Sequence, residues 1–223
     1  TEIEIAPESE RAINQALAYL TTVQNADGSW GEDKYYVSNT SLAVTAFMVK
    51  GHVPSKGKYG STIERGINYL LDRSTLRTDG YVADQSSGTM YQHCLAVMAF
   101  SEAWGQSKDP RLGPAVRKGA KILMKSQGDG GGWRYTPHPN DGDLSVTIMA
   151  IEALVSAKEA GVLVPDSVWT RARAFIHDCQ KPNKEGHFGY VPNKADETNS
   201  YRMGAGLLGL QLSGERDSEA LEL

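Results

Sequence analysis

Gln127-Gly128-Asp129-Gly130-Gly131-Gly132-Trp133 is the stretch that decides the fold, and Gln24-Asn25-Ala26-Asp27-Gly28-Ser29-Trp30 is its counterpart earlier in the chain. In both stretches a Gly follows the Gln after four residues and a Trp follows it after six. Aromatic residues also occur at Gly-containing turns at Tyr81 and Phe188. The four aromatic anchors stand about 51, 52 and 55 residues apart along the sequence. This regular spacing predicts an internal repeat of four units.

Each unit has the same internal order. A helix with one apolar stripe comes first, then the Gly-containing turn, then a nearly uncharged apolar helix. In the third unit Val116 and Leu123 share one helical face while Lys118 and Lys125 lie opposite. In the second unit, residues 85–101 contain no Asp, Glu, Lys or Arg. An amphipathic helix lies at a surface, whereas a helix that is apolar all round is buried.

The alternation of these two helix types predicts an all-α fold with amphipathic outer helices and apolar inner helices. Four such hairpins in sequence favour an α/α toroid. We expect residues 1–223 to form a single repeat domain with units at about 9–54, 60–108, 111–163 and 165–213. We also expect the inner helices to end at a C-cap glycine, followed by a proline that stops the helix. The glycines are Gly51, Gly105 and Gly161, and the prolines are Pro54, Pro110 and Pro165.

Composition narrows the classes of function. The chain has 223 residues, 40% of them hydrophobic, and a net charge of −4, so a nucleic-acid partner is not expected. No apolar run is long enough to span a membrane. The chain starts at Thr1 rather than Met, which leaves a removed secretion signal open and the compartment undetermined. A homo-oligomer is compatible with these features.

The turn of the first unit carries a family resemblance. Leu20, Gln24, Gly28 and Trp30 resemble the QW repeats of squalene–hopene cyclases and their relatives in the prenyltransferase and squalene-oxidase repeat group. The turn of the third unit has the same spacing. The second and fourth units depart from the pattern, because Arg77 stands at the Gln place in the second and neither turn contains Trp. The resemblance implies a toroid and leaves the reaction open.

A narrower resemblance rests on four further stretches. They are similar to uncharacterised bacterial repeat proteins, notably from planctomycetes, that carry the prenyltransferase-repeat label. The stretches are Met90-Tyr91-Gln92-His93 with Ser101-Glu102-Ala103-Trp104-Gly105, Gly131-Gly132-Trp133-Arg134-Tyr135-Thr136-Pro137, and Gly142-Asp143-Leu144-Ser145-Val146-Thr147.

Asp141 and Asp143 are the first candidates for catalysis. Class II terpene cyclases place Asp-x-Asp-Asp at the start of an inner helix, and its middle Asp protonates the substrate. Asp141 and Asp143 match the first two acids, whereas Leu144 replaces the last. The alternative is structural, because an acid at a helix N-terminus caps free backbone N–H groups. His93, in an uncharged stretch, is a third candidate as an acid or base, or else a core residue with satisfied hydrogen bonds.

Arginines and tyrosines near the turns are candidates for binding a ligand. Arg134 and Arg202 open otherwise apolar segments, where they would pair with Asp143 or Glu197 or hold a carboxylate or phosphate. The tyrosines would line a pocket for an isoprenoid or stack on sugars, or else pack one unit on the next. These tyrosines are Tyr36, Tyr91, Tyr135, Tyr190 and Tyr201.

No metal or cofactor is expected. His177-Asp178-Cys179 with His187 contains the residue types of the prenyltransferase zinc site, but Asp178 and Cys179 are adjacent and end an outer helix.

The leading functional hypothesis is a binding module whose central cavity holds an apolar small molecule or a partner, the ligand being an isoprenoid, a lipid or a glycan. The alternatives are a terpene-cyclase-type enzyme that uses Asp143 as general acid and a carbohydrate-active α/α barrel. Four hairpins predict an open or small barrel, and a half-open toroid would exclude water poorly from carbocation chemistry.

Overall fold

The computed structural model describes residues 5–32, 34–76, 79–84, 89–137, 141–180, 187–193 and 200–215. Within these ranges the regular secondary structure consists of eight helices, and two isolated bridges are the sole β pairing. This confirms the all-α fold that the sequence predicts. The helices are α1 (Pro7–Thr22), α2 (Tyr36–Val49), α3 (Gly60–Leu76), α4 (Thr89–Ser107), α5 (Leu112–Lys125), α6 (Leu144–Glu159), α7 (Asp166–Cys179) and α8 (Ser200–Leu212).

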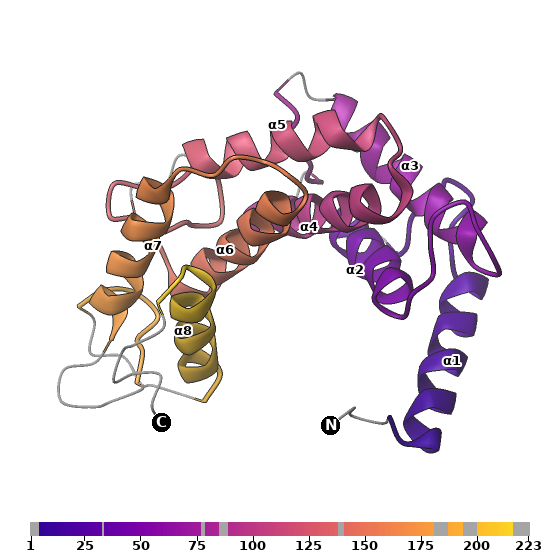
Figure 1. Ribbon diagram of the computed structural model, residues 1–223, viewed down its shortest axis with the longest axis horizontal. Coiled ribbons are helices and arrows are strands. Elements are labelled where there is room, and N and C mark those ends of the chain that lie inside the picture. The colour runs from indigo at the N-terminus through magenta and orange to yellow at the C-terminus, as the bar shows by residue number, and fades with distance from the viewer. Residues whose placement is uncertain are drawn as a thin grey trace.

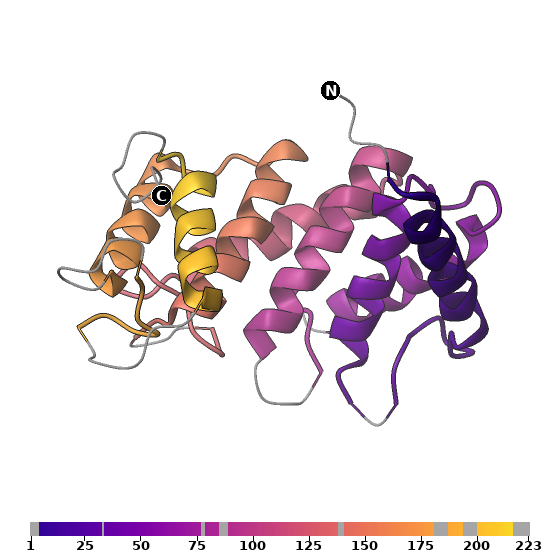
Figure 2. The ribbon, with the colours of Figure 1, turned by 90° about the horizontal axis from the view of Figure 1, so that it is seen from below.

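The helices alternate between two layers, as in an α/α toroid. Helices α2, α4, α6 and α8 pack on one another in chain order, and α3, α5 and α7 cover their outer side. Figures 1 and 2 show that the path curves, with α1 at one end and α8 at the other. The two ends do not meet, so the described chain forms an open arc.

The apolar pattern accounts for the two layers. In α5, Leu112, Val116 and Leu123 are almost completely buried, while Lys118 and Lys121 are exposed on the opposite face. In α6, by contrast, buried residues occur on nearly every side of the helix. Burial of apolar surface contributes about 25 cal/mol per Å². An outer helix therefore packs along one stripe, and an inner helix packs against neighbours on several sides.

Two of the three predicted C-cap glycines are confirmed. Gly51 and Gly161 follow α2 and α6 with φ of 89° and 96°, the left-handed conformation that glycine adopts without strain. The prediction for Gly105 is wrong, because α4 continues through it to Ser107. The left-handed residue there is Lys108, with φ of 56°.

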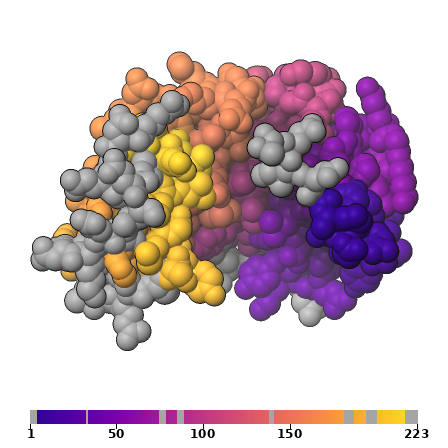
Figure 3. Space-filling model, turned by 60° about the horizontal axis from the view of Figure 1, so that its bottom comes forward, coloured from indigo at the N-terminus to yellow at the C-terminus, as the bar shows by residue number. Residues whose placement is uncertain are grey.

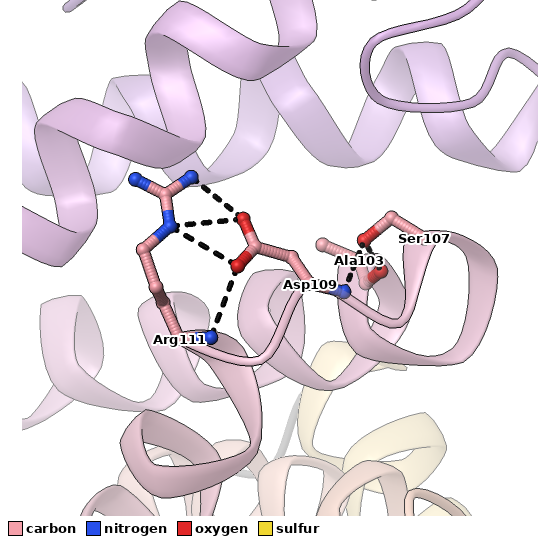
Figure 4. A network of polar contacts seen from close by, with 4 residues as sticks. All are labelled: Ala103, Ser107, Asp109 and Arg111. Atoms are coloured by element: carbon pink, nitrogen blue, oxygen red, sulfur yellow. Dashed lines mark hydrogen bonds and ion pairs between the residues drawn. The ribbon is translucent and has the colours of Figure 1, made fainter.

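Local side-chain hydrogen bonds stabilise this later end of α4 (Figure 4). The Ser107 hydroxyl donates to the Ala103 carbonyl at 2.7 Å, and the Asp109 N–H donates to Ser107 Oγ at 3.3 Å. Arg111 then pairs with Asp109 at 2.6 Å. These contacts hold the backbone where α4 ends, at Ser107, two residues beyond Gly105.

In the first three units, a hydrogen bond from the turn to the following inner helix sets the register. The Trp30 N–H donates to Thr40 Oγ1, and the Trp133 N–H donates to Thr147 Oγ1, both at 3.0 Å. In the second unit the equivalent donor is Val82, whose N–H lies 3.1 Å from His93 Nδ1. The assignment of Tyr81 as the second anchor is therefore one residue early, since Val82 occupies the place of the tryptophans.

Candidate binding site at the N-terminal rim of the inner helices

Each turn also contacts the inner helix of the unit before it. The N–H groups of Met90 and Leu144, in the first turns of α4 and α6, donate to the carbonyls of Tyr135 and Tyr190, each at 2.9 Å. In the first pair of units the Val37 N–H donates to Asp84 Oδ2 at 2.9 Å. Free N–H groups at a helix start require such partners. The contacts carry Tyr135 and Tyr190 to the N-terminal rim of the inner layer.

Asp143 lies at the centre of this rim and caps α6. Its Oδ1 accepts from the Val146 N–H at 3.0 Å and from the Ser145 hydroxyl at 2.6 Å. Asp143 has no exposed surface, and its Oδ2 has no hydrogen-bond partner within the described part of the chain. Asp143 therefore caps the N-terminus of α6, as the structural alternative predicts, and its carboxyl group is fully buried.

A chain of hydroxyl groups continues outward from Asp143. The single hydrogen of the Ser145 hydroxyl is committed to Asp143, so the Tyr91 hydroxyl, 2.7 Å from Ser145 Oγ, is the donor to it. The hydroxyls of Tyr135 and Tyr190 hydrogen-bond to each other. The Tyr91 and Tyr135 rings lie 6.1 Å apart between centroids. We call Tyr91, Tyr135, Asp143, Ser145 and Tyr190 the rim cluster.

Two tyrosines of the rim cluster, Tyr91 and Tyr190, stay protonated at neutral pH. Burial raises the pKa of Tyr91, and the nearby Asp143 carboxylate adds to the shift. Burial likewise raises the pKa of Tyr190, together with its hydrogen bond to Tyr135 and the charge of Asp143. A phenol in its neutral form both donates and accepts hydrogen bonds. The rim therefore offers a ligand neutral hydroxyl groups and aromatic faces.

Two arginines flank Tyr190. The guanidinium carbons of Arg134 and Arg202 lie 5.9 and 5.6 Å from the centroid of its ring, within the range of a cation–π contact. Arg134 also pairs with Asp141 at 3.3 Å, rather than with Asp143. Asp141 is largely exposed, so water screens this pair. Glu197, the other acid expected to pair with an arginine, lies outside the described residues.

The remaining predicted site residues do not join the rim cluster through any contact that the structure describes. His93 is completely buried, and its Nε2 lies 3.2 Å from the Gly119 carbonyl while Nδ1 accepts from Val82. It therefore ties α4 to α5 rather than facing a ligand. Tyr36 packs partly against the core at the start of α2. Tyr201 is 85% exposed in the first turn of α8.

The described residues that resemble a zinc site do not form a ligand group. His177 Nε2 lies 2.8 Å from a Glu215 carboxylate oxygen, and Cys179 is buried. Among the residues that the structure places, no group of three or more His, Cys, Asp or Glu side chains could hold a metal ion. Within the same residues, no helix is long and apolar enough to cross a membrane.

Sequence reasoning missed Glu152 as a candidate. It occupies a partly buried position in α6, and burial raises the pKa of its carboxyl. The available signal was a single acid within an otherwise uncharged segment of an inner helix. On the same side of the inner layer, Leu95 of α4 and Met149 of α6 are only partly buried. These two side chains leave apolar surface partly exposed on the inner layer.

Comparison with known proteins supports the fold and leaves the chemistry open. No known protein-family model matches the chain, and no curated protein matches it significantly in sequence. A type II terpene cyclase, MstE from Scytonema, solved with its product merosterolic acid A, is similar over 97% of this chain with a TM-score of 0.64 and 15% identity. An unsaturated glucuronyl hydrolase specific for heparin is similar over 91% of this chain with a TM-score of 0.58 and 12% identity. This chain spans 62% of the cyclase chain and 67% of the hydrolase chain, and at these identities the likeness shows the fold alone.

Proposed function

We propose that this chain is a binding module that holds an amphiphilic small molecule, an isoprenoid or another lipid, on the concave side of its inner helices. The observation that carries the proposal is the rim cluster. Tyr91, Tyr135 and Tyr190 come from three successive units and meet at one edge of the inner layer. Small-molecule sites combine an apolar lining with a few converging polar groups, and this edge has both.

The two parts of the site would bind different parts of the ligand. The partly buried Leu95 and Met149 would contact the apolar body. The tyrosine hydroxyls would bind a polar head, and the guanidinium groups of Arg134 and Arg202 beside Tyr190 would favour a negatively charged one. The type II terpene cyclase with a similar fold was solved with its product merosterolic acid A, which supports a ligand of this kind.

Native mass spectrometry of the purified protein, followed by organic extraction, is the first test. We expect a co-purifying lipid or, for the emptied protein, saturable binding of farnesyl diphosphate with weaker binding of farnesol. Replacing Arg134 and Arg202 together by Gln should weaken farnesyl diphosphate about tenfold or more while changing farnesol little. The exposed loop residue Leu163, replaced by Ser, is the matched surface control. Binding of heparin oligosaccharides without binding of either isoprenoid would contradict the proposal.

A second candidate function, an enzyme of the terpene-cyclase type, has one observation in its favour. The Oδ2 of Asp143 is buried and has no hydrogen-bond partner within the described residues, as expected of an oxygen that could carry a transferable proton. The binding module ranks first because a general acid must come within about 2.6–3.2 Å of the atom it protonates, and Asp143 has no exposed surface. Incubation with squalene and polyprenyl diphosphates, followed by mass spectrometry of the products, separates the two. Cyclised product that Asp143→Asn abolishes would favour the enzyme.

A further inference from the structure

The inner helices can be aligned residue by residue, which allows equivalent surfaces to be compared. Thr40, His93 and Thr147 all accept the N–H of a turn anchor, so they mark the same position in α2, α4 and α6. In α8 the buried residues Gly206, Gly209 and Ser213 fall at the spacing of Ala150, Ala153 and Ala157 in α6. A Cβ at Gly209 would collide with Ile148, which places this stripe against α6.

Among the described residues, no inner helix covers the face of α2 that corresponds to a covered face of α4 and α6. In α4, Gln92 and Ala99 are buried at 1% and 0% exposure. Their equivalents in α6, Val146 and Ala153, are both completely buried. The corresponding residues of α2 are Asn39 and Ala46, and both are exposed. They line a hollow of about 380 Å³ together with Leu20, Trp30, Gly31, Leu42 and Ala43.

In the part of the chain that the structure describes, no further inner helix packs on the opposite face of α8. Gly204 and Gln211 are exposed there, whereas the equivalents of Gly204, which are Cys94 in α4 and Ile148 in α6, have 0% and 5% exposure. Ser101, the equivalent of Gln211 in α4, is 4% exposed. Leu208, which shares this face, is 39% exposed. Figures 1 and 3 show α8 and the N-terminal helices on separate sides of the molecule.

We propose that these two open faces bind each other between two copies of the chain, head to tail. The face of α2 in one copy, formed by Asn39, Leu42 and Ala46, would pack on the face of α8 in the next, formed by Gly204, Leu208 and Gln211. This contact would continue the series in which α2 packs on α4, α4 on α6 and α6 on α8.

The chemistry of the two faces suits this partner. Neither face carries an Asp, Glu, Lys or Arg side chain, so pairing them buries no unpaired charge. Lys50, at the edge of the α2 face, is already paired with Glu10 at 2.6 Å. Leu208 would enter the hollow beside Ala46, and the amides of Asn39 and Gln211 would supply hydrogen bonds. A contact between two different surfaces is heterologous, so each copy retains one face for a further copy.

Two single substitutions test the proposal without disturbing the core. Ala46→Glu adds a charge to the α2 face, and Gly204→Glu adds one to the α8 face, where a new Cβ meets no atom within 4 Å. Gly105→Glu is the matched control, because Gly105 is also an exposed helical glycine whose Cβ would meet nothing within 4 Å. Circular dichroism verifies that all three variants fold.

Mass should be measured by light scattering and sedimentation from about 1 to 100 µM. We expect the wild type and Gly105→Glu to associate, and each face variant alone to stay monomeric. An equimolar mixture of the two face variants should form dimers, because the intact α8 face of one meets the intact α2 face of the other. A monomeric wild type throughout this range would overturn the proposal. So would a dimer that Ala46→Glu abolishes and Gly204→Glu leaves intact, since that pattern indicates pairing of two α2 faces.

Discussion

The turns of the second and third units reach the same backbone geometry with different side chains. In the third unit Trp133 is completely buried and its N–H bonds to Thr147 at 3.0 Å. In the second unit Val82 takes that place, and His93 replaces the threonine as acceptor at 3.1 Å. The comparison teaches that the repeat keeps a hydrogen bond and a buried contact, while the residue types that supply them change.

The hydrogen bond that links a unit to the next outer helix also comes from a different position in the two units. In the third unit Gln127 Nε2 donates to the carbonyls of Gly131 at 2.8 Å and Val168 at 3.0 Å, the second of which lies in α7. In the second unit His93 contacts the Gly119 carbonyl of α5 at 3.2 Å. The link to the next outer helix therefore starts from the turn in one unit and from the inner helix in the other.

The largest expected difference between the two turns is in the anchor side chains. Trp133→Ala should lower the free energy of unfolding by about 3–5 kcal/mol, because it empties a large buried volume and removes the indole N–H bond to the Leu123 carbonyl. Val82→Ala removes two methyl groups and should cost about 2 kcal/mol. Urea denaturation of both variants measures the difference. Equal losses would show that the tryptophan is not the main anchor of the third unit.

The glycines with positive φ give the next contrast. Gly131 has φ of 90°, and an added Cβ would collide with the backbone carbonyl of Arg171. Gly80 has φ of 83°, and its Cβ would meet the Lys118 side chain at 3.1 Å, which can move. Both Gly→Ala changes incur a conformational cost of about 1–2 kcal/mol. Gly131→Ala should cost about 1–2 kcal/mol more in chemical denaturation, since only its clash forces the backbone to shift. A smaller loss for Gly131→Ala than for Gly80→Ala would contradict this reading.

The sequence alone predicts most of the fold. The period of the apolar stripes predicts the helices, and the Gln–Gly–Trp spacing predicts the repeated units. The aromatic side chain of Tyr81 predicts an anchor at that position, whereas the register is set by the backbone N–H of Val82, which the sequence does not display. Gly105 failed as a helix end because Ser107 and Asp109 supply local partners beyond it.

The candidate site was predictable only in part. Tyr91, Tyr135 and Tyr190 could be picked out as aromatics near turns, but their convergence depends on bonds between units, such as that from the Leu144 N–H to the Tyr190 carbonyl at 2.9 Å. The hydroxyl of Ser145 was missed because serine at a helix start reads as an ordinary N-terminal residue. Its link between Asp143 and Tyr91 appears only in three dimensions.

The glutamines that begin the turns of the first and third units provide a finer test. Gln127→Ala should cost about 1–3 kcal/mol, because it removes two buried hydrogen bonds, to the carbonyls of Gly131 and Val168. Gln24 makes the same two bonds, to Gly28 at 2.9 Å and Thr62 at 3.0 Å, in a partly exposed site. Water can replace a lost donor there, so Gln24→Ala should cost less. Thermal denaturation of the two variants side by side gives the order, and a larger loss for Gln24→Ala would reverse it.

The smallest expected effect depends on pH and concerns the inner helices. Glu152 of α6 stands where α4 has Met98, and burial raises the pKa of its carboxyl above the usual value for a glutamate. The folded state therefore binds the proton of the Glu152 carboxyl more tightly than the unfolded state does. The resulting contribution to stability is fully present below about pH 4.5 and is lost as the pH rises through the raised pKa. Glu152→Met should thus stabilise the protein more at pH 7 than at pH 4, which paired urea titrations at the two pH values would measure. Glu102→Gln, at an exposed position of α4, controls for the loss of one acid. An equal gain from Glu152→Met at both pH values would mean that packing by the methionine, rather than relief of a buried charge, accounts for the effect.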